Sequence, residues 1–201
     1  MILPMVAKYI NEVVEIHYNS IEFKNLLLPK LGPKIMTLYY QYALQSDENL
    51  GFVYIDGENV QGFIFGTVNK SNFYRQIFLR SKFKISCFII LRLIRKPFLL
   101  LLLIRYTIQK ILLPKEEQNP YNAELITIAV NKEIRGKKIG KKLVQTLNKK
   151  FIDYGVSKYQ VIVEEENKAA ILFYKKLGFQ YMKNFVEFGR KCVLYDFEIC
   201  H

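Results

Sequence analysis

The sequence is poor in the side chains on which many enzymes and metal sites depend. Its 201 residues include three cysteines, Cys87, Cys192 and Cys200, and two histidines, His17 and His201. An odd number of cysteines without paired spacing argues against a disulfide framework and against a zinc site, and it suits a reduced, cytosolic protein. With so few histidines, mechanisms that rely on a catalytic histidine are poorly supplied.

Long hydrophobic runs are also missing. The opening residues, MILPMVAKYI, have no basic segment and too short an apolar run for a secretory signal. The most apolar stretch, residues 88–113, is interrupted by Arg and Lys, and its longest uncharged run covers residues 97–104. A membrane-spanning helix needs about 20 apolar residues. The sequence therefore predicts no simple transmembrane helix and a cytoplasmic location.

Acidic residues are absent from one window. Residues 70–115 contain eleven Lys or Arg and no Asp or Glu, in a chain whose net charge is +12. Nearly all the net charge is thus a local patch. Because the window is rich in Leu and Ile, we interpret it as amphipathic helices that form a lid, or as a segment lying on an anionic membrane surface, peripheral to its inner face. The same composition disfavours nucleic acid as its partner, since backbone-tracking segments are more polar.

The other segments predict an α/β protein of one domain, residues 1–201. Apolar periodicity and turn residues predict helices over 6–20, 35–44, 139–154 and 167–177, and strands over 51–56, 60–68, 124–130, 159–163, 180–188 and 191–199. The order strand, helix, strand from residue 124 to 163 is a βαβ crossover, which requires two parallel strands. Hairpins on either side imply antiparallel neighbours. The prediction is a mixed, mostly antiparallel sheet with helices on both faces.

A glycine- and lysine-rich turn, NKEIRGKKIGKKL at residues 131–143, lies between the strand and the helix of this crossover. A helix N-terminus offers unpaired N–H groups and partial positive charge, and glycine lets the backbone approach an anion closely. This chemistry suits a pyrophosphate or a phosphomonoester. The spacing of Gly136 and Gly140 fits neither the P-loop nor the dinucleotide fingerprint.

Two segments resemble the GNAT superfamily of N-acetyltransferases. ELITIAVNKEIRGKKIGKKL, residues 124–143, resembles the acetyl-CoA signature, except that Lys138 stands where the family has its first glycine. NKAAILFYKKLGF, residues 167–179, resembles the second signature. The resemblance is strong over 124–179, weaker over 6–68, and absent from the 70–115 window. It implies the GNAT fold with a basic, helical insert at 70–115.

The resemblance also implies an activity: acetyl transfer from acetyl-CoA to a primary amine by direct attack in a ternary complex, with no metal. It places the thioester and pantetheine along the backbone of Ile128, Ala129 and Val130, and the pantetheine amide near Asn167. It assigns the pyrophosphate to one continuous turn, made of Arg135, Gly136, Lys137, Lys138, Ile139, Gly140 and Lys141.

Two catalytic residues are predicted. Tyr174 matches the family's proton donor to the leaving thiolate, although on spacing alone it also fits a core tyrosine. Glu124 begins the central strand, where it either takes the proton of the amine, directly or through water, or is a plain surface carboxylate. The run of glutamates at 164–166 fits a solvated charge cluster better than a base. An amine of low pKa needs no dedicated base.

The acceptor stays open among an amino-sugar intermediate, a protein or peptide N-terminus and a small amine. An alternative from another class also stays open. It is a non-catalytic protein of the same fold that binds acyl-CoA or docks on a membrane or a partner, with Lys138 disabling the pocket. A positive φ at Lys138 would favour crowding of the pyrophosphate, whereas a helical backbone there would tolerate lysine.

Overall fold

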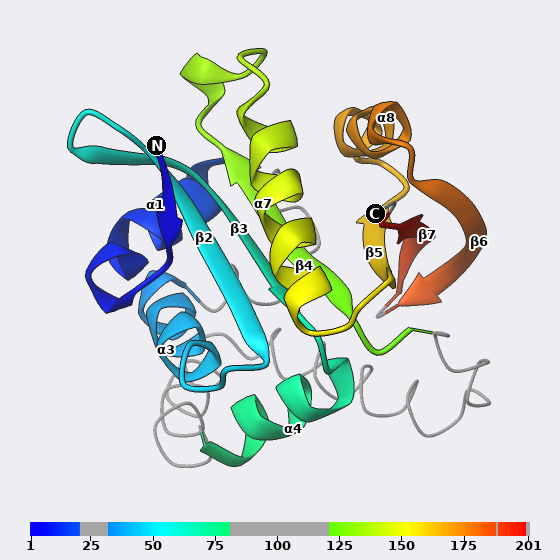
Figure 1. Cartoon of the computed structure of the whole chain (residues 1–201), viewed down its shortest axis with the longest axis horizontal. Coiled ribbons are helices and arrows are strands. Elements are labelled where there is room, and N and C mark those ends of the chain that lie inside the picture. Colours follow the sequence, from blue (N-terminus) through cyan, green and yellow to red (C-terminus); the bar gives the residue numbers. More distant parts are fainter. Residues whose placement is uncertain (21–31, 81–120, 188, 200–201) are drawn as a thin grey trace.

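The computed structural model describes residues 1–20, 32–80, 121–187 and 189–199. Its seven strands form one sheet in the order β1-β2-β3-β4-β5-β7-β6, in which β4 and β5 are the parallel pair (Figure 1). The predicted mixed, mostly antiparallel sheet with a central parallel crossover is confirmed. The strands are β1 Ile2–Pro4, β2 Asn49–Asp56, β3 Asn59–Thr67, β4 Glu124–Val130, β5 Lys158–Glu164, β6 Gln180–Glu187 and β7 Arg190–Glu198.

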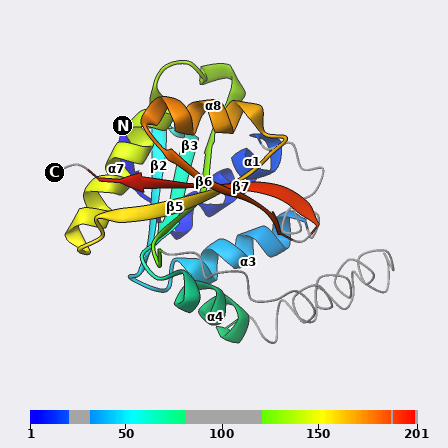
Figure 2. The same ribbon diagram turned by 90° about the vertical axis from the view of Figure 1, so that its right-hand side faces the viewer.

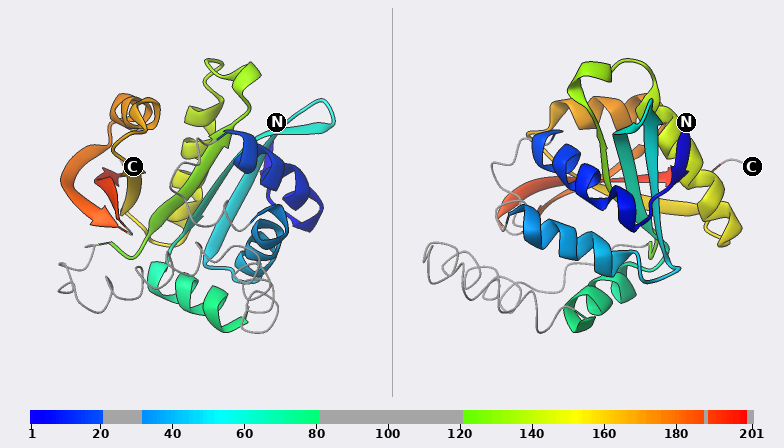
Figure 3. Two further views of the ribbon diagram at one scale, coloured as in Figure 1. Left: turned by 180° about the vertical axis from the view of Figure 1, so that it is seen from behind. Right: turned by 90° about the vertical axis from the view of Figure 1, so that its left-hand side faces the viewer.

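Helices cover both faces of the sheet, as predicted. Helix α7 crosses one face over β2, β3 and β4, while α1 and α3 lie on the opposite face (Figures 2 and 3). The helices are α1 Ile10–Ser20, α3 Pro33–Ala43, α4 Lys70–Arg80, α7 Ile139–Asp153 and α8 Lys168–Leu177, with short 3-10 turns at Ala7–Tyr9 and Lys132–Ile134.

Apolar periodicity explains why each helix lies where it does. On α7, a buried stripe recurs every fourth residue, at Ile139, Leu143, Leu147 and Phe151. This stripe reaches the sheet because Gly66 of β3 has no side chain: a Cβ there would lie 3.1 Å from both Leu147 and Phe151. On the other face, α1 and α3 bury a second cluster, including Val13, Met36, Tyr40, Phe63 and Phe65.

Three features differ from or go beyond the sequence prediction. Strand β1 was not predicted, because three residues ending in a proline carry no period-2 signal, yet Leu3 pairs with Val53 at the edge of the sheet. The first predicted helix begins with a 3-10 turn and becomes α-helical at Ile10. Within the predicted insert, α4 is helical, and the rest of the insert lies outside the described residues. No helix in the described ranges is long and apolar enough to cross a membrane.

Candidate active site

The parallel strands β4 and β5 are paired only at their beginnings. Two residue pairs join them, Glu124 with Gln160 and Leu125 with Val161. Beyond this point β4 follows β3 and β5 follows β7, so the two strands diverge into a fork (Figures 1 and 3). Along residues 126–130, the β5 side of β4 has no strand partner among the described residues. Its backbone groups are therefore available to an extended ligand, since peptide groups need hydrogen-bond partners.

A β-bulge marks the start of this fork. Against β3, Leu125 lies opposite Gly66 and Thr127 lies opposite Phe65, which leaves Ile126 without an opposing residue. A bulge re-aims side chains and is frequent next to active sites. Ile126 packs against the cluster under α1 and α3, whereas Ile128, two residues further on, packs against the cluster under α7, so the bulge shifts the alternation of side chains along β4.

Glu124 is buried at the base of the fork, which excludes the interpretation of a surface carboxylate. Its side chain is 5% exposed, and the Lys70 ammonium lies 2.9 Å from its Oε2 atom. The Gln160 side chain donates to the same Oε2 from Nε2 at 2.6 Å. The second carboxylate oxygen, Oε1, has no hydrogen-bond partner among the described residues. That oxygen is the one available to accept a proton.

Gln160 is fully buried and holds a fixed orientation. Its Oε1 atom has no partner within the described ranges. Turning the amide over would place this oxygen against the carboxylate of Glu124, so the observed orientation, with the amide N–H groups toward Glu124, is the favourable one.

The charge of Glu124 affects the pKa of other titratable groups. Burial, and after it the charge of Glu124, raises the pKa of Tyr39 on α3 above its ordinary value. Burial also raises the pKa of Glu187 at the end of β6, with Glu124 adding to the rise and with Arg190 and Lys70 opposing it. The end of α3, the start of α4 and the tip of the β6–β7 hairpin thus converge on the base of the fork.

In the glutamate run that ends β5, Glu164 forms an ion pair, whereas Glu166 is exposed as predicted. Glu164 is partly buried and pairs with Arg190 of β7 at 2.6 Å, and Arg190 also lies 3.7 Å from Glu187. This ion pair fastens the β6–β7 hairpin to β5.

At its other end, β4 leads into the predicted anion turn. Arg135 donates from Nε to the carbonyl of Val130 at 3.2 Å and closes the turn. Gly136 has a φ of 87° and Lys138, the N-cap of α7, has a φ of 60°. Glycine adopts this left-handed conformation freely, whereas lysine is strained there by about 1–2 kcal/mol.

The first turn of α7 is exposed and cationic. No side chain caps the helix, and no acidic residue lies in its first turn. Lys137, Lys138, Lys141 and Lys142 are all exposed. A helix start with free N–H groups and surrounding lysines is suited to a multiply charged anion.

Gly140 has a packing role that the sequence did not reveal. A Cβ at this position would lie 3.1 Å from two ring atoms of Phe173 on α8. Glycine at 140 therefore lets α7 and α8 approach each other across the fork.

Tyr174 lies in the core, 4% exposed, with its ring against Phe173 and Phe179. Burial raises the pKa of Tyr174 above its ordinary value, so the hydroxyl keeps its proton at neutral pH. A buried tyrosine that retains its proton is compatible both with the predicted donor and with a plain core residue.

Asn167 is the N-cap of α8. Its Oδ1 accepts a hydrogen bond from the Ala170 amide at 3.0 Å, which is a standard cap interaction. Because Oδ1 is used by the cap, the side-chain nitrogen Nδ2 is the atom that would make the predicted contact with pantetheine.

His17 lies away from the fork, on α1. Its Nδ1 atom is 2.8 Å from the Tyr40 hydroxyl, and burial lowers the pKa of His17 to about 4. It is thus a neutral core residue, in keeping with the low expectation for histidine catalysis.

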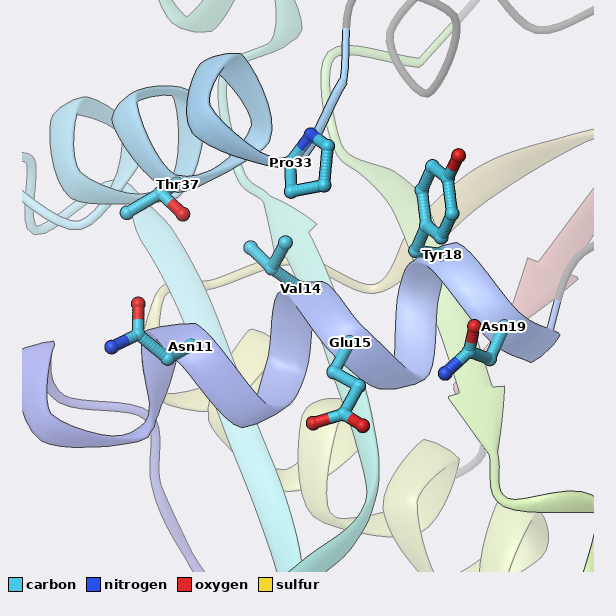
Figure 4. A pocket seen from close by; sticks show the side chains of 7 residues that line it. All are labelled: Asn11, Val14, Glu15, Tyr18, Asn19, Pro33 and Thr37. Atoms are coloured by element: carbon cyan, nitrogen blue, oxygen red, sulfur yellow. The ribbon is translucent and has the colours of Figure 1, made fainter.

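A shallow groove of about 340 Å³ runs between α1 and α3 (Figure 4). Its lining is Asn11, Val14, Glu15, Tyr18, Asn19, Pro33 and Thr37. None of the predicted site residues lines this groove.

The structure adds two residues that sequence reasoning missed, Lys70 and Gln160. Gln160 stands beside Glu124 in the parallel pair; both strands were predicted, but their register was not. Lys70 was counted only as part of the basic window. No group of residues suited to holding a metal occurs in the described ranges.

Comparisons with known proteins agree with the fold. The sequence model of the acetyltransferase (GNAT) family matches residues 20–179. No curated protein matches the chain. Among solved structures, an N-acetyltransferase from Staphylococcus aureus Mu50 has a TM-score of 0.61 at 13% identity, covering 98% of this chain and 97% of its own. The protein smu.2055 from Streptococcus mutans UA159 has a TM-score of 0.60 at 18% identity, covering 98% of both chains.

A third structure, the ribosomal-protein-S18-alanine N-acetyltransferase from Escherichia coli, has a TM-score of 0.58 at 14% identity, covering 100% of this chain and 94% of its own. Identities this low show a shared fold.

Proposed function

The chain belongs to the acetyltransferase (GNAT) family, and on this premise we propose that it transfers an acetyl group from acetyl-CoA to a primary amine, by direct attack in a ternary complex. The acceptor is a small molecule or the N-terminus of a protein or peptide. The proposal treats residues 1–201 as a single acetyltransferase domain.

One observation carries the proposal: the open edge of β4 leads directly into a cationic helix start. Residues 126–130 leave backbone groups free on the side of the fork, and the next residues form the turn with the exposed lysines of α7. Acetyl-CoA has the matching shape and charge, an amide-bearing arm attached to a pyrophosphate. We assign the arm to Ile128, Ala129, Val130 and Asn167, and the pyrophosphate to the turn of Arg135, Gly136, Lys137, Lys138, Ile139, Gly140 and Lys141.

Glu124 and Tyr174 supply the proton transfers that this reaction needs. The amine nitrogen attacks the thioester carbonyl carbon, a C–N bond forms and the C–S bond breaks. Glu124 takes the proton of the amine at Oε1, directly or through water. Tyr174 gives its hydroxyl proton to the leaving thiolate. General acid and base groups contribute about 10²–10⁴-fold each.

Calorimetry with acetyl-CoA, followed by thiol-release assays, tests the proposal. Acetyl-CoA should bind and raise the melting temperature by mass action. Spermidine, glucosamine 1-phosphate and a peptide beginning with alanine represent the three acceptor classes, and at least one should release CoA thiol and gain an acetyl group by mass spectrometry. An absence of binding at saturating acetyl-CoA would refute the proposal. Binding without transfer to any acceptor would favour the non-catalytic alternative.

We propose further that the basic insert lies against an anionic membrane surface. The support is its charge: eleven cationic and no acidic residues at 70–115, each worth about 1 kcal/mol near such a surface. The protein should sediment with vesicles containing phosphatidylserine, less so at high salt, and not with pure phosphatidylcholine vesicles. Replacing Arg92, Arg95, Lys96 and Arg105 by Gln should release it and leave acetyl-CoA binding unchanged. Indifference to anionic vesicles at low salt would leave the lid as the remaining interpretation.

A further inference from the structure

The first residue of the basic insert is turned inward, toward the base of the fork. Lys70 begins α4, and its amide donates to the Asn122 carbonyl at 2.8 Å, just ahead of β4. Its ammonium lies 2.9 Å from Glu124, and the Lys70 side chain is 21% exposed. One of the eleven positive charges of the window is therefore paired with a buried carboxylate of the protein.

The start of α4 is held in place by neutral and acidic partners. The Asn69 side chain caps it, with Oδ1 accepting from the Asn72 amide at 3.1 Å. The Glu48 carboxylate accepts hydrogen bonds from both side-chain amides, from Asn69 Nδ2 at 3.3 Å and from Asn72 Nδ2 at 2.5 Å. Lys70 thus projects from a fixed backbone, and its contact with Glu124 follows from the architecture of the helix start.

We propose that Lys70 is a positioning residue for acetyl transfer: it keeps the buried Glu124 carboxylate charged and holds its Oε2 atom, so that Oε1 is left to take the proton of the acceptor amine. The catalytic part of this inference rests on the function proposed above. Lys70 lies outside the two signature segments at 124–143 and 167–179 and enters the site from the insert.

Burial is the reason that Glu124 needs such a partner. A carboxylate removed from water becomes protonated unless an opposite charge or hydrogen-bond donors favour its ionised form. A protonated carboxyl group cannot act as a base. Gln160 supplies one neutral donor to Oε2, and Lys70 supplies a full positive charge to the same atom.

The remaining groups around Glu124 do not replace this charge. Tyr39 from α3 is neutral at physiological pH, and burial and the charge of Glu124 raise its pKa still further above the ordinary value. Glu187 from β6 carries the same sign as Glu124, and the charge of Arg190 acts on Glu187. Thr67, which stands opposite Glu124 on β3, is uncharged. Among the described residues, Lys70 is the cation in direct contact with Glu124.

Carbon-13 NMR of protein labelled at the glutamate side-chain carboxyl tests the inference without any acceptor. Loss of one resonance in Glu124→Gln assigns the signal. In Lys70→Met, which keeps the aliphatic stem and removes the charge, the titration midpoint of the Glu124 carboxylate should rise, because the ionised form loses its cationic partner. Lys70→Arg should leave it in place. Lys150→Met, which breaks the exposed pair with Asp153 at 3.1 Å, is the matched control and should also leave it in place.

Kinetic measurements then test whether the charge of Glu124 matters for the reaction. They use whichever of the three acceptors, spermidine, glucosamine 1-phosphate or the peptide, has the highest kcat/KM. The acid limb of the pH profile of kcat/KM has two contributions, the ionisation of the acceptor amine and that of Glu124, and the second should disappear in Glu124→Gln. In Lys70→Met this second contribution should move to higher pH by the same interval as the NMR midpoint, so that activity is lost near neutral pH and recovered in alkali. Lys70→Arg should restore the original profile.

Three results would overturn the inference. One is a lower melting temperature in Lys70→Met with an unmoved midpoint, which is the behaviour of a purely structural ion pair. Another is a moved midpoint with an unmoved acid limb. The third applies if Lys70→Met does not fold. The Lys70→Gln variant, which keeps an amide donor, is then used, and a wild-type titration midpoint of Glu124 in this folded variant would overturn the inference. A wild-type protein that transfers no acetyl group at any pH would instead refute the proposed function, and the NMR midpoint would still decide whether Lys70 keeps Glu124 charged.

Discussion

The two ends of β4 carry polar groups of opposite kinds. At its beginning, Glu124 is buried and held between Lys70 and Gln160. Past its end, Lys137 and Lys138 are exposed beside a helix start with no side-chain cap. Buried charges need fixed partners because desolvation is costly, whereas exposed cations need none and are screened by salt. The first arrangement suits proton transfer at a defined atom, and the second suits binding of a large anion.

Removal of the buried carboxylate gives the largest expected effect and tests the first end. Glu124→Gln keeps the shape of the side chain and removes its basicity, so kcat should fall by about 10³-fold, within the range for a general base. Initial rates of thiol release measure this. Glu133→Gln, an exposed carboxylate of the turn, is the matched control and should act like wild type. An unchanged kcat in Glu124→Gln would mean that no dedicated base operates.

Tyr174 sharpens the comparison, because it is a buried group close to the cationic end. Tyr174→Phe keeps the ring packed against Phe179 and removes the hydroxyl. The value of kcat should fall by about 10²-fold, while the dissociation constant for acetyl-CoA changes little. Rapid-mixing kinetics should first establish that chemistry limits the rate. If kcat then stays at its wild-type value, Tyr174 is a core residue alone.

The exposed lysines should affect binding and leave the chemical step unchanged. Replacing Lys137, Lys141 and Lys142 together by Gln should weaken acetyl-CoA binding by about 10-fold, since exposed charges contribute about 0.2–1 kcal/mol each. The salt dependence of binding should flatten, and kcat at saturating acetyl-CoA should hold. Calorimetry at two salt concentrations measures both. The double variant Lys175→Gln and Lys176→Gln, in the last turn of α8, is the control. An equal loss of acetyl-CoA affinity in this variant would mean that the net charge of the protein, and not the turn, determines binding.

The smallest effect is expected from the strained residue of the turn. Lys138→Gly relieves a left-handed backbone with a φ of 60°, and the greater freedom of glycine in the unfolded chain offsets part of the gain. The net stabilisation should be about 0.5 kcal/mol, or roughly 1–2 °C in melting temperature. Lys132→Gly, in the neighbouring 3-10 turn, should lower the melting temperature instead. Thermal denaturation decides between these signs, and a lower melting temperature in Lys138→Gly would show that lysine is accommodated without strain.

Much of the fold was predictable because its signals are local. The four-residue repeat of Ile139, Leu143, Leu147 and Phe151 predicted α7 within one residue of its observed end. Strand, turn and helix in that order required a parallel neighbour for β4, and the structure has it in β5. Strand β1 escaped prediction because three residues are too short for a period to be visible.

The candidate site was predictable in part. Its glycine and lysine turn could be read directly, because a helix start and its charges are close together in the chain. The conformation of Lys138 could not, since lysine prefers a negative φ and only the path from Arg135 to Ile139 imposes the positive one. Likewise, the sequence indicated anion binding at Gly140 but not its close packing against the ring of Phe173.

The sequence by itself determined most of the elements of this protein, their order, the parallel crossover and the cationic helix start, because each depends on residues that are neighbours in the chain. Only the tertiary structure decided that β4 and β5 part after two residue pairs and that Lys70 meets Glu124. Those outcomes depend on how a bulge, a twisted sheet and the start of α4 pack together. A contact between side chains far apart in the sequence leaves no periodic signal in either segment, so packing alone could reveal it.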